Sequence, residues 1–397
     1  MSLIDLPFTR TEYESRLLRV RAAMEHAGLE LLFVADPSNM HWLSAYDGWS
    51  FYVHQGLLVP LEGEPVYWGR AMDAIGATKT CWMSYENIVG YPDHFVQSTE
   101  RHPMSHLAEL IAERGWTEAR LGVEMENYYY SAKAHAVLTA EMGRPPDDAT
   151  GLVNWCRVVK SPAELGFIRR AARIVEHMHE RIWEVFEPGV RKNDVVAEIY
   201  RAGIAGAEDE DGRYGGDYAA ICPLLPTGEE AAAAHLTWND RPVPDGSGTF
   251  FEIAGCYRRY HAPLSRTIWL GEPPIEVRRA EEAVLEGIEA GIDAARAGNV
   301  AGDVARAFYA VLGRHGIARA GRCGYSIGVS YPPDWGERTF SIRAEDETVL
   351  LPDMVFHFMP ALWMHDWGLE ITETLHLQHE GPAVPLANVE RKLFVKA

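Results

Sequence analysis

Cysteine is scarce in this sequence and follows no pattern. The five cysteines are scattered along the chain, at Cys81, Cys156, Cys222, Cys256 and Cys323. No two of them form a CxxC pair, which argues against both a zinc knuckle and a framework of disulfides. Small proteins of oxidising compartments commonly depend on such frameworks. We therefore expect this chain to work in a reducing cytoplasm.

Positive charge is also in short supply. The chain has 37 Lys and Arg residues against 57 Asp and Glu, a net charge of −20, and no stretch rich in Lys or Arg. Nucleic acids and anionic membranes attract basic surfaces, so both are unfavourable partners. The acidic balance is compatible with a cationic or zwitterionic small substrate, and it is equally compatible with a simple role in solubility.

Long apolar segments are missing as well. No apolar run approaches the roughly 18 residues that would suggest a membrane span. The first residues, MSLIDLPFTRTEYESR, lack the basic segment followed by an apolar one that marks a secretory signal. We expect neither a membrane anchor nor export.

The length of 397 residues favours two domains. Strands and helices alternate up to about residue 150, a pattern that predicts a smaller α/β domain over residues 1–155. Its first helix is expected to begin at Thr9. There Thr9 and Glu12 predict a capping box, in which each side chain accepts a hydrogen bond from the other residue's backbone N–H.

A second domain is predicted over residues 156–397. Ser161 and Glu164 enclose a Pro at the first turn, so they predict a capped helix. Two further helices are expected near residues 276–297 and 300–315. The expected strands are residues 217–225, 248–255, 261–271, 353–360 and 369–378. Helices outside a strongly bent sheet, without regular βαβ repetition, indicate an α+β fold.

Five segments of this second domain resemble, in the right order, the motifs of the creatinase/prolidase/methionine aminopeptidase family, whose fold is known as pita-bread. They are PTGEEAAAAH (226–235), FFEIAGCYRRYHAPLSRT (250–267), GRCGYSIGVS (321–330), LLPDMVFHFMP (350–360) and GLEITETL (368–375). The segment RVVKSPAELGFIRRAARI (157–174) resembles the linker and first helix of the creatinase and prolidase branch. The resemblance implies an α+β pita-bread domain preceded by a smaller α/β creatinase-type domain.

The metalloenzymes of this family bind two metal ions through two Asp, one His and two Glu, and the resemblance places those positions on different residues here. They fall on Glu252, Pro263, Tyr325, Met359 and Thr372. Divalent metals need several converging oxygen or nitrogen donors. Pro and Met do not supply them. The resemblance therefore implies a site that works without metal and without another cofactor, as creatinase does.

Within the family, three segments resemble most closely the bacterial ectoine hydrolases. They are NMHWLSAYDGWSFY (39–52), GCYRRYHAPLSRT (255–267) and CGYSIGVSYPPDWGE (323–337). These enzymes open the cyclic amidine ring of ectoine, a small zwitterion, to N-acetyl-2,4-diaminobutyrate. Three alternatives stay open: another metal-free amidinohydrolase such as a creatine hydrolase, a proline-specific metallopeptidase, and an inactive domain that only binds peptides or proteins.

The resemblance and the chemistry of an amidinium ion together suggest catalytic residues. Glu252 is expected to hold the cation and either to attack its C2 carbon or to act as base toward a water; the alternative is an acid merely paired with a nearby Arg. His235 is the expected proton shuttle. Tyr325 is expected either to donate a hydrogen bond to the developing intermediate or only to pack. Glu373 is expected to hold the second amidinium nitrogen or to orient His235.

Five further residues are expected to bind the substrate. Tyr52 and Trp49 lie in an aromatic segment that, in the creatinase branch, reaches the partner subunit's active site, and aromatic faces attract cations. The resemblance therefore implies a homodimer with shared sites. Arg322 is the candidate for the substrate carboxylate, Trp363 for the pocket wall, and Glu370 competes with Glu373 for the amidinium. A deacetylase is the expected consumer of the product and a candidate physical partner.

Overall fold

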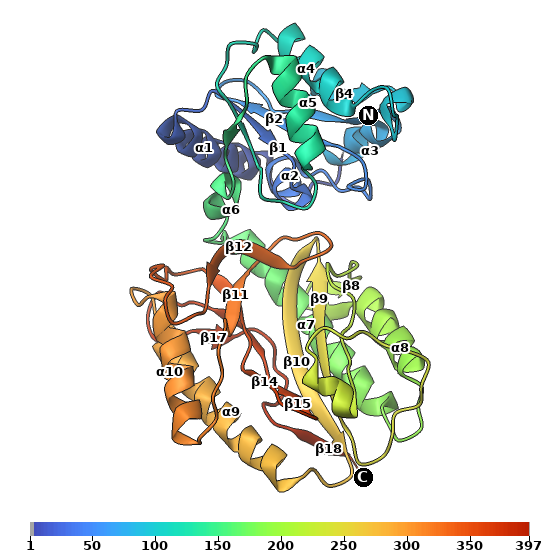
Figure 1. The fold of residues 1–397 in the computed structure, drawn as a ribbon, viewed down its shortest axis with the longest axis vertical. Coiled ribbons are helices and arrows are strands. Elements are labelled where there is room, and N and C mark those ends of the chain that lie inside the picture. The colour runs from blue at the N-terminus through green and yellow to red at the C-terminus, as the bar shows by residue number, and fades with distance from the viewer. Residues whose placement is uncertain (1–3, 397) are drawn as a thin grey trace. The chain divides into compact units, whose positions relative to one another are not determined.

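The computed structural model describes residues 4–396 of the chain (Figure 1). These residues form two compact units, divided between Arg157 and Val158. Each unit contains a hydrophobic core of its own. Within the described residues, no helix is both long and apolar enough to cross a membrane.

The first unit is built on one six-stranded mixed sheet in the order β4-β3-β2-β1-β5-β6. Its strands are β1 (Leu31–Val34), β2 (Gly56–Pro60), β3 (Val66–Arg70), β4 (Ile88–Tyr91), β5 (Leu121–Val123) and β6 (Asp147–Asp148). Its helices are α1 (Arg10–Ala27), α2 (Pro37–Ser44), α3 (Ala71–Thr80), α4 (Pro103–Glu113), α5 (Ala132–Met142) and α6 (Leu152–Cys156), with 3-10 turns at Tyr85–Asn87 and Asp93–Phe95. Every residue of the central strand β1 is buried, as expected for a strand covered on both faces.

The first helix begins at Thr9 as predicted, but its cap is only half of a capping box. The Thr9 hydroxyl accepts a hydrogen bond from the Glu12 backbone N–H. The Glu12 carboxylate does not return the bond to Thr9; instead its Oε1 accepts from Nη2 of the buried Arg16 at 2.7 Å. The predicted reciprocal box is therefore wrong, because a guanidinium is a stronger donor to a carboxylate than a backbone amide is.

The second unit places helices on both sides of long, curved strands (Figure 1). Figure 1 shows α9 and α10 on one side of these strands and α7 and α8 on the other. The helices are α7 (Pro162–Val185), α8 (Lys192–Ala205), α9 (Ile275–Ala294) and α10 (Ala301–Arg314), with a 3-10 turn at Gly228–Ala232. The core between α9, α10 and the strands is rich in aliphatic and Phe side chains.

The strands of this unit form two main sheets. One has the order β18-β10-β9, and the other has the order β12-β11-β13-β16-β17. The strands are β7 (Ala207–Asp209), β8 (Gly212–Tyr214), β9 (Gly248–Tyr257), β10 (Tyr260–Leu270), β11 (Gly324–Ile327), β12 (Gly336–Ser341), β13 (Val355–Phe358), β14 (Ala361–Trp363), β15 (Gly368–Glu370), β16 (Glu373–His376), β17 (Val384–Pro385) and β18 (Phe394–Lys396). The long antiparallel hairpin of β9 and β10 carries the first metal motif of the family resemblance.

Helix α7 fixes the position of this hairpin. The capping box predicted for Ser161 and Glu164 is confirmed, with Pro at the first turn. The buried face of α7 packs on β9 and β10. A Cβ atom on Gly255 would lie only 2.0 Å from the carbonyl oxygen of Ala171, so helix and strand touch backbone to backbone there. Only glycine permits this approach.

Several elements of the second unit differ from those expected. Residues 217–225 form no strand and make one isolated bridge, between Leu224 and Glu252, because Pro223 has no N–H for a ladder. Residues 369–378 divide into β15 and β16, because the Thr372 N–H bonds to a carbonyl of β10 instead of continuing the strand. Helix α8 has no predicted counterpart; its N-cap residue, Arg191, makes no side-chain cap.

Candidate active site

Glu252 lies near the middle of β9 with its side chain buried, opposite Ser265 on β10. In the part of the chain that the structure describes, no hydrogen bond or ion pair reaches its carboxyl group. The alternative of an acid paired with Arg258, Arg259 or Arg322 therefore has no support. Burial raises the pKa of Glu252 to about 7, because removal from water disfavours the charged form.

A second buried carboxyl group, that of Glu370 on β15, lies within the electrostatic reach of the first. Burial, and then the charge of Glu252, raise the pKa of Glu370 well above its ordinary value. Its Oε1 accepts a hydrogen bond from Trp363 Nε1 at 3.0 Å. The hydroxyl of Thr267 holds the backbone, accepting from the Glu370 N–H at 2.9 Å and donating to the Glu370 carbonyl at 3.1 Å. Two such groups resist ionising together, so the pair carries less than its full negative charge near neutral pH.

Tyr325, on β11, also senses the charge of Glu252. Its hydroxyl oxygen is 2.8 Å from Trp335 Nε1, which donates to it, and 3.2 Å from His357 Nδ1. The Arg322 guanidinium lies 4.6 Å from the centroid of the Tyr325 ring. Burial and the charge of Glu252 raise the pKa of Tyr325 well above its ordinary value, so its hydroxyl stays protonated at neutral pH.

His357 and Thr372 extend this hydrogen-bonded group, and the sequence analysis gave neither of them a role. His357 is directly opposite Tyr325 in the β11–β13 pairing. Its Nε2 is 2.8 Å from Thr372 Oγ1, which also accepts the Ser265 N–H at 2.7 Å. A signal for His357 was present: it precedes Met359 by two residues, and alternate residues of a strand share a face.

The predicted residues of the second unit divide into two groups. The structure brings together Glu252, Glu370, Tyr325, Trp363 and Arg322. It leaves His235 exposed, beyond the 3-10 turn, and without a hydrogen bond among the described residues. The role of His235 as a proton shuttle stays a prediction.

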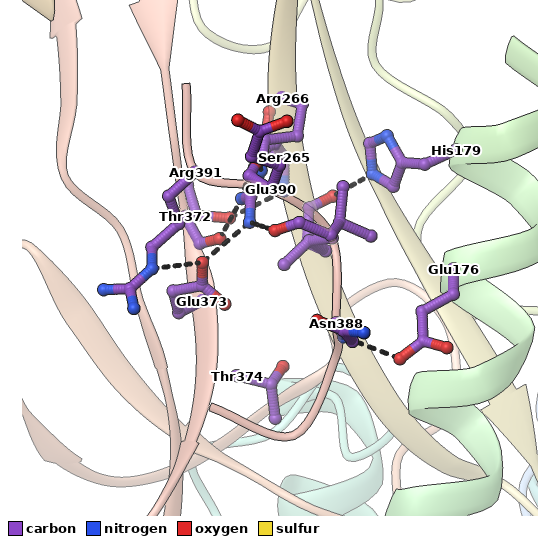
Figure 2. Close-up of polar contacts among 12 residues, drawn as sticks. Glu176, His179, Ser265, Arg266, Thr372, Glu373, Thr374, Asn388, Glu390 and Arg391 are labelled. Carbon is purple, nitrogen blue, oxygen red and sulfur yellow. Dashed lines mark hydrogen bonds and ion pairs between the residues drawn. The ribbon is translucent and has the colours of Figure 1, made fainter. Parts of the chain in front are cut away.

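Glu373 is held in a separate buried ion pair (Figure 2). Arg266 Nη2 lies 2.7 Å from Glu373 Oε1, and Arg391 Nε lies 3.8 Å from the same oxygen. Arg266 also donates to four main-chain carbonyl groups, those of Ser265, Thr372, Val389 and Glu390. These contacts describe a structural ion pair, and none of them connects Glu373 with His235 or Glu252. The catalytic role expected for Glu373 stays a prediction.

Tyr52 and Trp49 belong to the first unit, between α2 and β2. They are 63% and 59% exposed, which is unusual for large aromatic side chains. Phe51 stands between them in the chain, and its ring centroid lies 4.7 Å from that of Trp49. Tyr52 also lines a pocket of about 360 Å³ with His54 and Tyr128. Both side chains are largely exposed in this chain, and their substrate contacts stay predictions.

The five positions at which the family binds metal do not form a metal-binding set in this chain. Glu252 supplies one carboxylate, Pro263 and Met359 supply no hard donor, and the hydroxyls of Tyr325 and Thr372 are engaged in hydrogen bonds. Within residues 4–396, no group of three or more His, Cys, Asp or Glu side chains could hold a metal ion. The residues present do not fit a two-metal centre, and we derive no step through one.

Comparisons with known proteins agree with this picture of the two units. Residues 166–379 match the model of metallopeptidase family M24, and residues 16–159 match that of the creatinase/prolidase N-terminal domain. The chain is 56% identical over 400 residues to the ectoine hydrolase of Halomonas elongata, with 100% of both chains covered. It is 39% identical to an uncharacterized hydrolase/peptidase of Sinorhizobium fredii, covering 98% of this chain and 99% of that one.

Solved structures give the same fold at lower identity. The dipeptidase PepE of Mycobacterium ulcerans superposes with a TM-score of 0.78 at 23% identity, covering 98% of this chain and 99% of the other. Together with the two family models, this likeness confirms the predicted architecture, a pita-bread domain preceded by a smaller creatinase-type domain.

Proposed function

The chain belongs to metallopeptidase family M24, in its creatinase/prolidase branch, and from this premise we propose that it hydrolyses the cyclic amidine ring of ectoine without a metal ion. The observation that carries the proposal is the buried Glu252 carboxyl group, which has no cationic side chain beside it among the described residues. An unpaired buried carboxylate is unfavourable, and a bound amidinium would supply the missing charge. The full-length similarity to the Halomonas enzyme supports the same substrate.

The chemistry follows from the substrate's own charge. An amidinium spreads positive charge over N–C–N, so its C2 carbon is already electrophilic. Glu252 attacks C2 and forms a C–O bond. One C2–N ring bond then breaks, and its electron pair leaves with the nitrogen, which takes up a proton through His235. One water cleaves the adduct, so that N-acetyl-2,4-diaminobutyrate leaves and the Glu252 carboxylate is regenerated.

The neighbouring side chains suit the rest of the substrate. Glu370, held by Trp363, adds a second acid beside the amidinium, and the indole forms part of the pocket wall. The Arg322 guanidinium supplies a counter-charge for the ectoine carboxylate. Tyr325 provides a neutral hydroxyl that the charge of Glu252 reaches.

The proposal extends to the assembly and its setting. We place the reaction in the cytoplasm and assign it to a homodimer. In this dimer Tyr52 and Trp49 of one subunit would contact the substrate bound in the other; their exposure in a single chain supports this assignment. The product carries an N-acetyl group, so a deacetylase is the enzyme that would act on it next, and we propose it as a candidate partner.

The test compares substrates on the purified protein. Ectoine, creatine and an Xaa-Pro dipeptide are incubated separately, and products are followed by NMR spectroscopy, with the Glu252→Gln variant as the matched control. We expect ectoine alone to be consumed, and only by the unaltered protein. An adduct on the peptide containing Glu252, found by mass spectrometry after an acid quench, would establish attack by the carboxylate. Turnover of creatine or the dipeptide in place of ectoine would contradict the proposal.

A further inference from the structure

We infer that Trp335, His357 and Thr372 orient the Tyr325 hydroxyl so that its hydrogen is donated into the site, toward Glu252. The relay crosses three neighbouring strands or strand ends: β11 carries Tyr325, β13 carries His357, and Thr372 immediately precedes β16. The direction of each hydrogen bond follows from counting donors and acceptors. The inference rests on the proposed function only for the identity of the bound molecule that accepts the hydrogen bond from Tyr325.

The count begins at Thr372. Its hydroxyl oxygen accepts the Ser265 backbone N–H, and a backbone amide can only donate. The hydroxyl hydrogen of Thr372 therefore needs an acceptor of its own. The contact that the structure provides for it is His357 Nε2, at 2.8 Å. Because Thr372 is fully buried, an unmade bond here would carry the full cost of a desolvated hydroxyl.

The tautomer of His357 follows from this assignment. Burial lowers the pKa of His357 to about 3, so the ring is neutral and carries one hydrogen. If Nε2 accepts from Thr372, the hydrogen lies on Nδ1. His357 Nδ1 then donates to the Tyr325 oxygen at 3.2 Å. The opposite tautomer would leave the buried Thr372 hydroxyl hydrogen without a partner.

Tyr325 is left with one free direction. Its oxygen accepts from His357 Nδ1 and also from Trp335 Nε1, and an indole N–H can only donate. Both acceptor positions of the phenolic oxygen are thus filled, and its own hydrogen cannot point at either neighbour. Glu252 lies opposite Ser265, whose N–H donates to Thr372 in this relay, and the charge of Glu252 acts on the Tyr325 hydroxyl. The hydrogen is therefore available to Glu252 and to a molecule bound against it.

This orientation selects for the reacting state of an amidine. In the planar amidinium the nitrogen lone pairs are shared with C2, so the nitrogens offer hydrogens and accept none. When C2 becomes tetrahedral, the lone pairs return to the nitrogens, and each nitrogen becomes an acceptor. A fixed Tyr325 O–H can bond to a ring nitrogen of the substrate only at that moment, and a bond made only there lowers the barrier without tightening substrate binding. His357, Thr372 and Trp335 are positioning residues, because they act through Tyr325.

The tautomer can be tested without any substrate. Protein labelled with ¹⁵N in histidine is examined by long-range ¹H–¹⁵N correlation NMR, which distinguishes the two neutral tautomers. The His357 signal is assigned from its loss in His357→Asn and, independently, from its displacement in Thr372→Val. We expect a neutral ring with its hydrogen on Nδ1 throughout pH 6–9. A hydrogen on Nε2, or a ring that titrates in this range, would overturn the inference even if ectoine is not the substrate.

A kinetic arm then tests the consequence for catalysis. Tyr325→Phe should lower kcat by about 100-fold with little change in KM, as for loss of a transition-state donor. Thr372→Val, which removes the hydroxyl, should lower kcat by about 2- to 10-fold, the equivalent of one ordinary hydrogen bond. Thr372→Ser, which keeps the hydroxyl, should have a kcat near that of the unaltered protein. In the Tyr325→Phe background, Thr372→Val should have no further effect on kcat. Equal losses in both backgrounds would show that Thr372 does not act through Tyr325.

Discussion

Arg266 and Glu373 form a buried ion pair in which Nη2 and Oε1 are 2.7 Å apart and each side chain is about 1% exposed. Removing one partner of such a pair leaves an uncompensated buried charge. We expect Glu373→Gln to lower the free energy of unfolding by about 3 kcal/mol, measured by urea denaturation, with kcat of the folded enzyme unchanged.

The matched control is the Glu289 carboxylate, which is 70% exposed and pairs with the half-buried Arg391. Glu289→Gln should cost less than about 1 kcal/mol, because water screens the pair. A loss of kcat in Glu373→Gln without a loss of stability would instead place Glu373 in the chemistry.

Glu252 should make the folded protein less stable as pH rises. Its pKa is about 7 in the folded protein, above its ordinary value of 4.5. The folded state therefore holds its proton longer than the unfolded state does, and stability falls between about pH 4.5 and pH 7. Glu252→Gln should remove this fall and gain roughly 3 kcal/mol over the unaltered protein at pH 8.

Glu252→Gln should also lower kcat at least about 100-fold, so the same substitution raises the stability and lowers the activity. Glu282→Gln removes an exposed acid of the same unit and should change neither quantity. Urea denaturation at pH 5 and pH 8 measures the stability effect. Equal stability of Glu252→Gln and the unaltered protein at both pH values would contradict the burial argument.

The pH dependence of the reaction should show the same group. Attack requires the Glu252 carboxylate, so kcat/KM for ectoine should rise with pH through a midpoint near 7, the value of the free enzyme. A bound amidinium stabilises the carboxylate, so the midpoint of kcat should lie below that of kcat/KM. A kcat/KM that stays constant from pH 5 to pH 8 would rule out Glu252 as the titrating group.

Metal removal should leave the activity intact. The positions of the family's ligands carry Glu252, Pro263, Tyr325, Met359 and Thr372, which do not form a two-metal set. We expect dialysis against a chelator to leave kcat unchanged and added Mn²⁺, Co²⁺ or Zn²⁺ to have no stimulating effect. A stoichiometric metal ion that is needed for turnover would contradict the metal-free mechanism and support the metallopeptidase alternative.

Tyr52 and Trp49 test the shared site. Because both side chains are largely exposed, Tyr52→Ala and Trp49→Ala should leave the free energy of unfolding nearly unchanged. Each should raise KM for ectoine by losing about 0.5–2 kcal/mol of cation–π contact. Tyr85→Ala, at a residue 78% exposed in the same unit, is the control and should leave KM unchanged. KM values equal to that control would exclude both residues from the substrate contact.

The motifs predicted the centre of the site because each one lies within a single strand or its end. Glu252 and Tyr325 occupy ligand positions of the family, and strand geometry keeps those positions directed inward. Glu373 follows Thr372 directly, and adjacent residues of an extended chain face opposite sides, so the motif alone did not predict which residue Glu373 contacts. Its contacts are with Arg266 rather than with Glu252.

His357 and Trp335 escaped prediction for a different reason. His357 meets Tyr325 across a strand pair, 32 residues away in the chain, and no local pattern records such a register. Trp335 approaches the same hydroxyl from the segment before β12. The roles of His357 and Trp335 follow from the hydrogen bonds that they donate to Tyr325, and these can be assigned only from three-dimensional coordinates.

Gly255 shows how far a catalytic geometry can depend on a residue with no chemistry. The hairpin rests on α7 at a point where even one methyl group would collide with Ala171. The position of Glu252 therefore depends on the close backbone contact between α7 and β9 at Gly255, three residues farther along the strand. Substitution of Gly255 should therefore displace Glu252, and a mutational survey that ranked residues by lost activity would rank this glycine beside the acid that it positions.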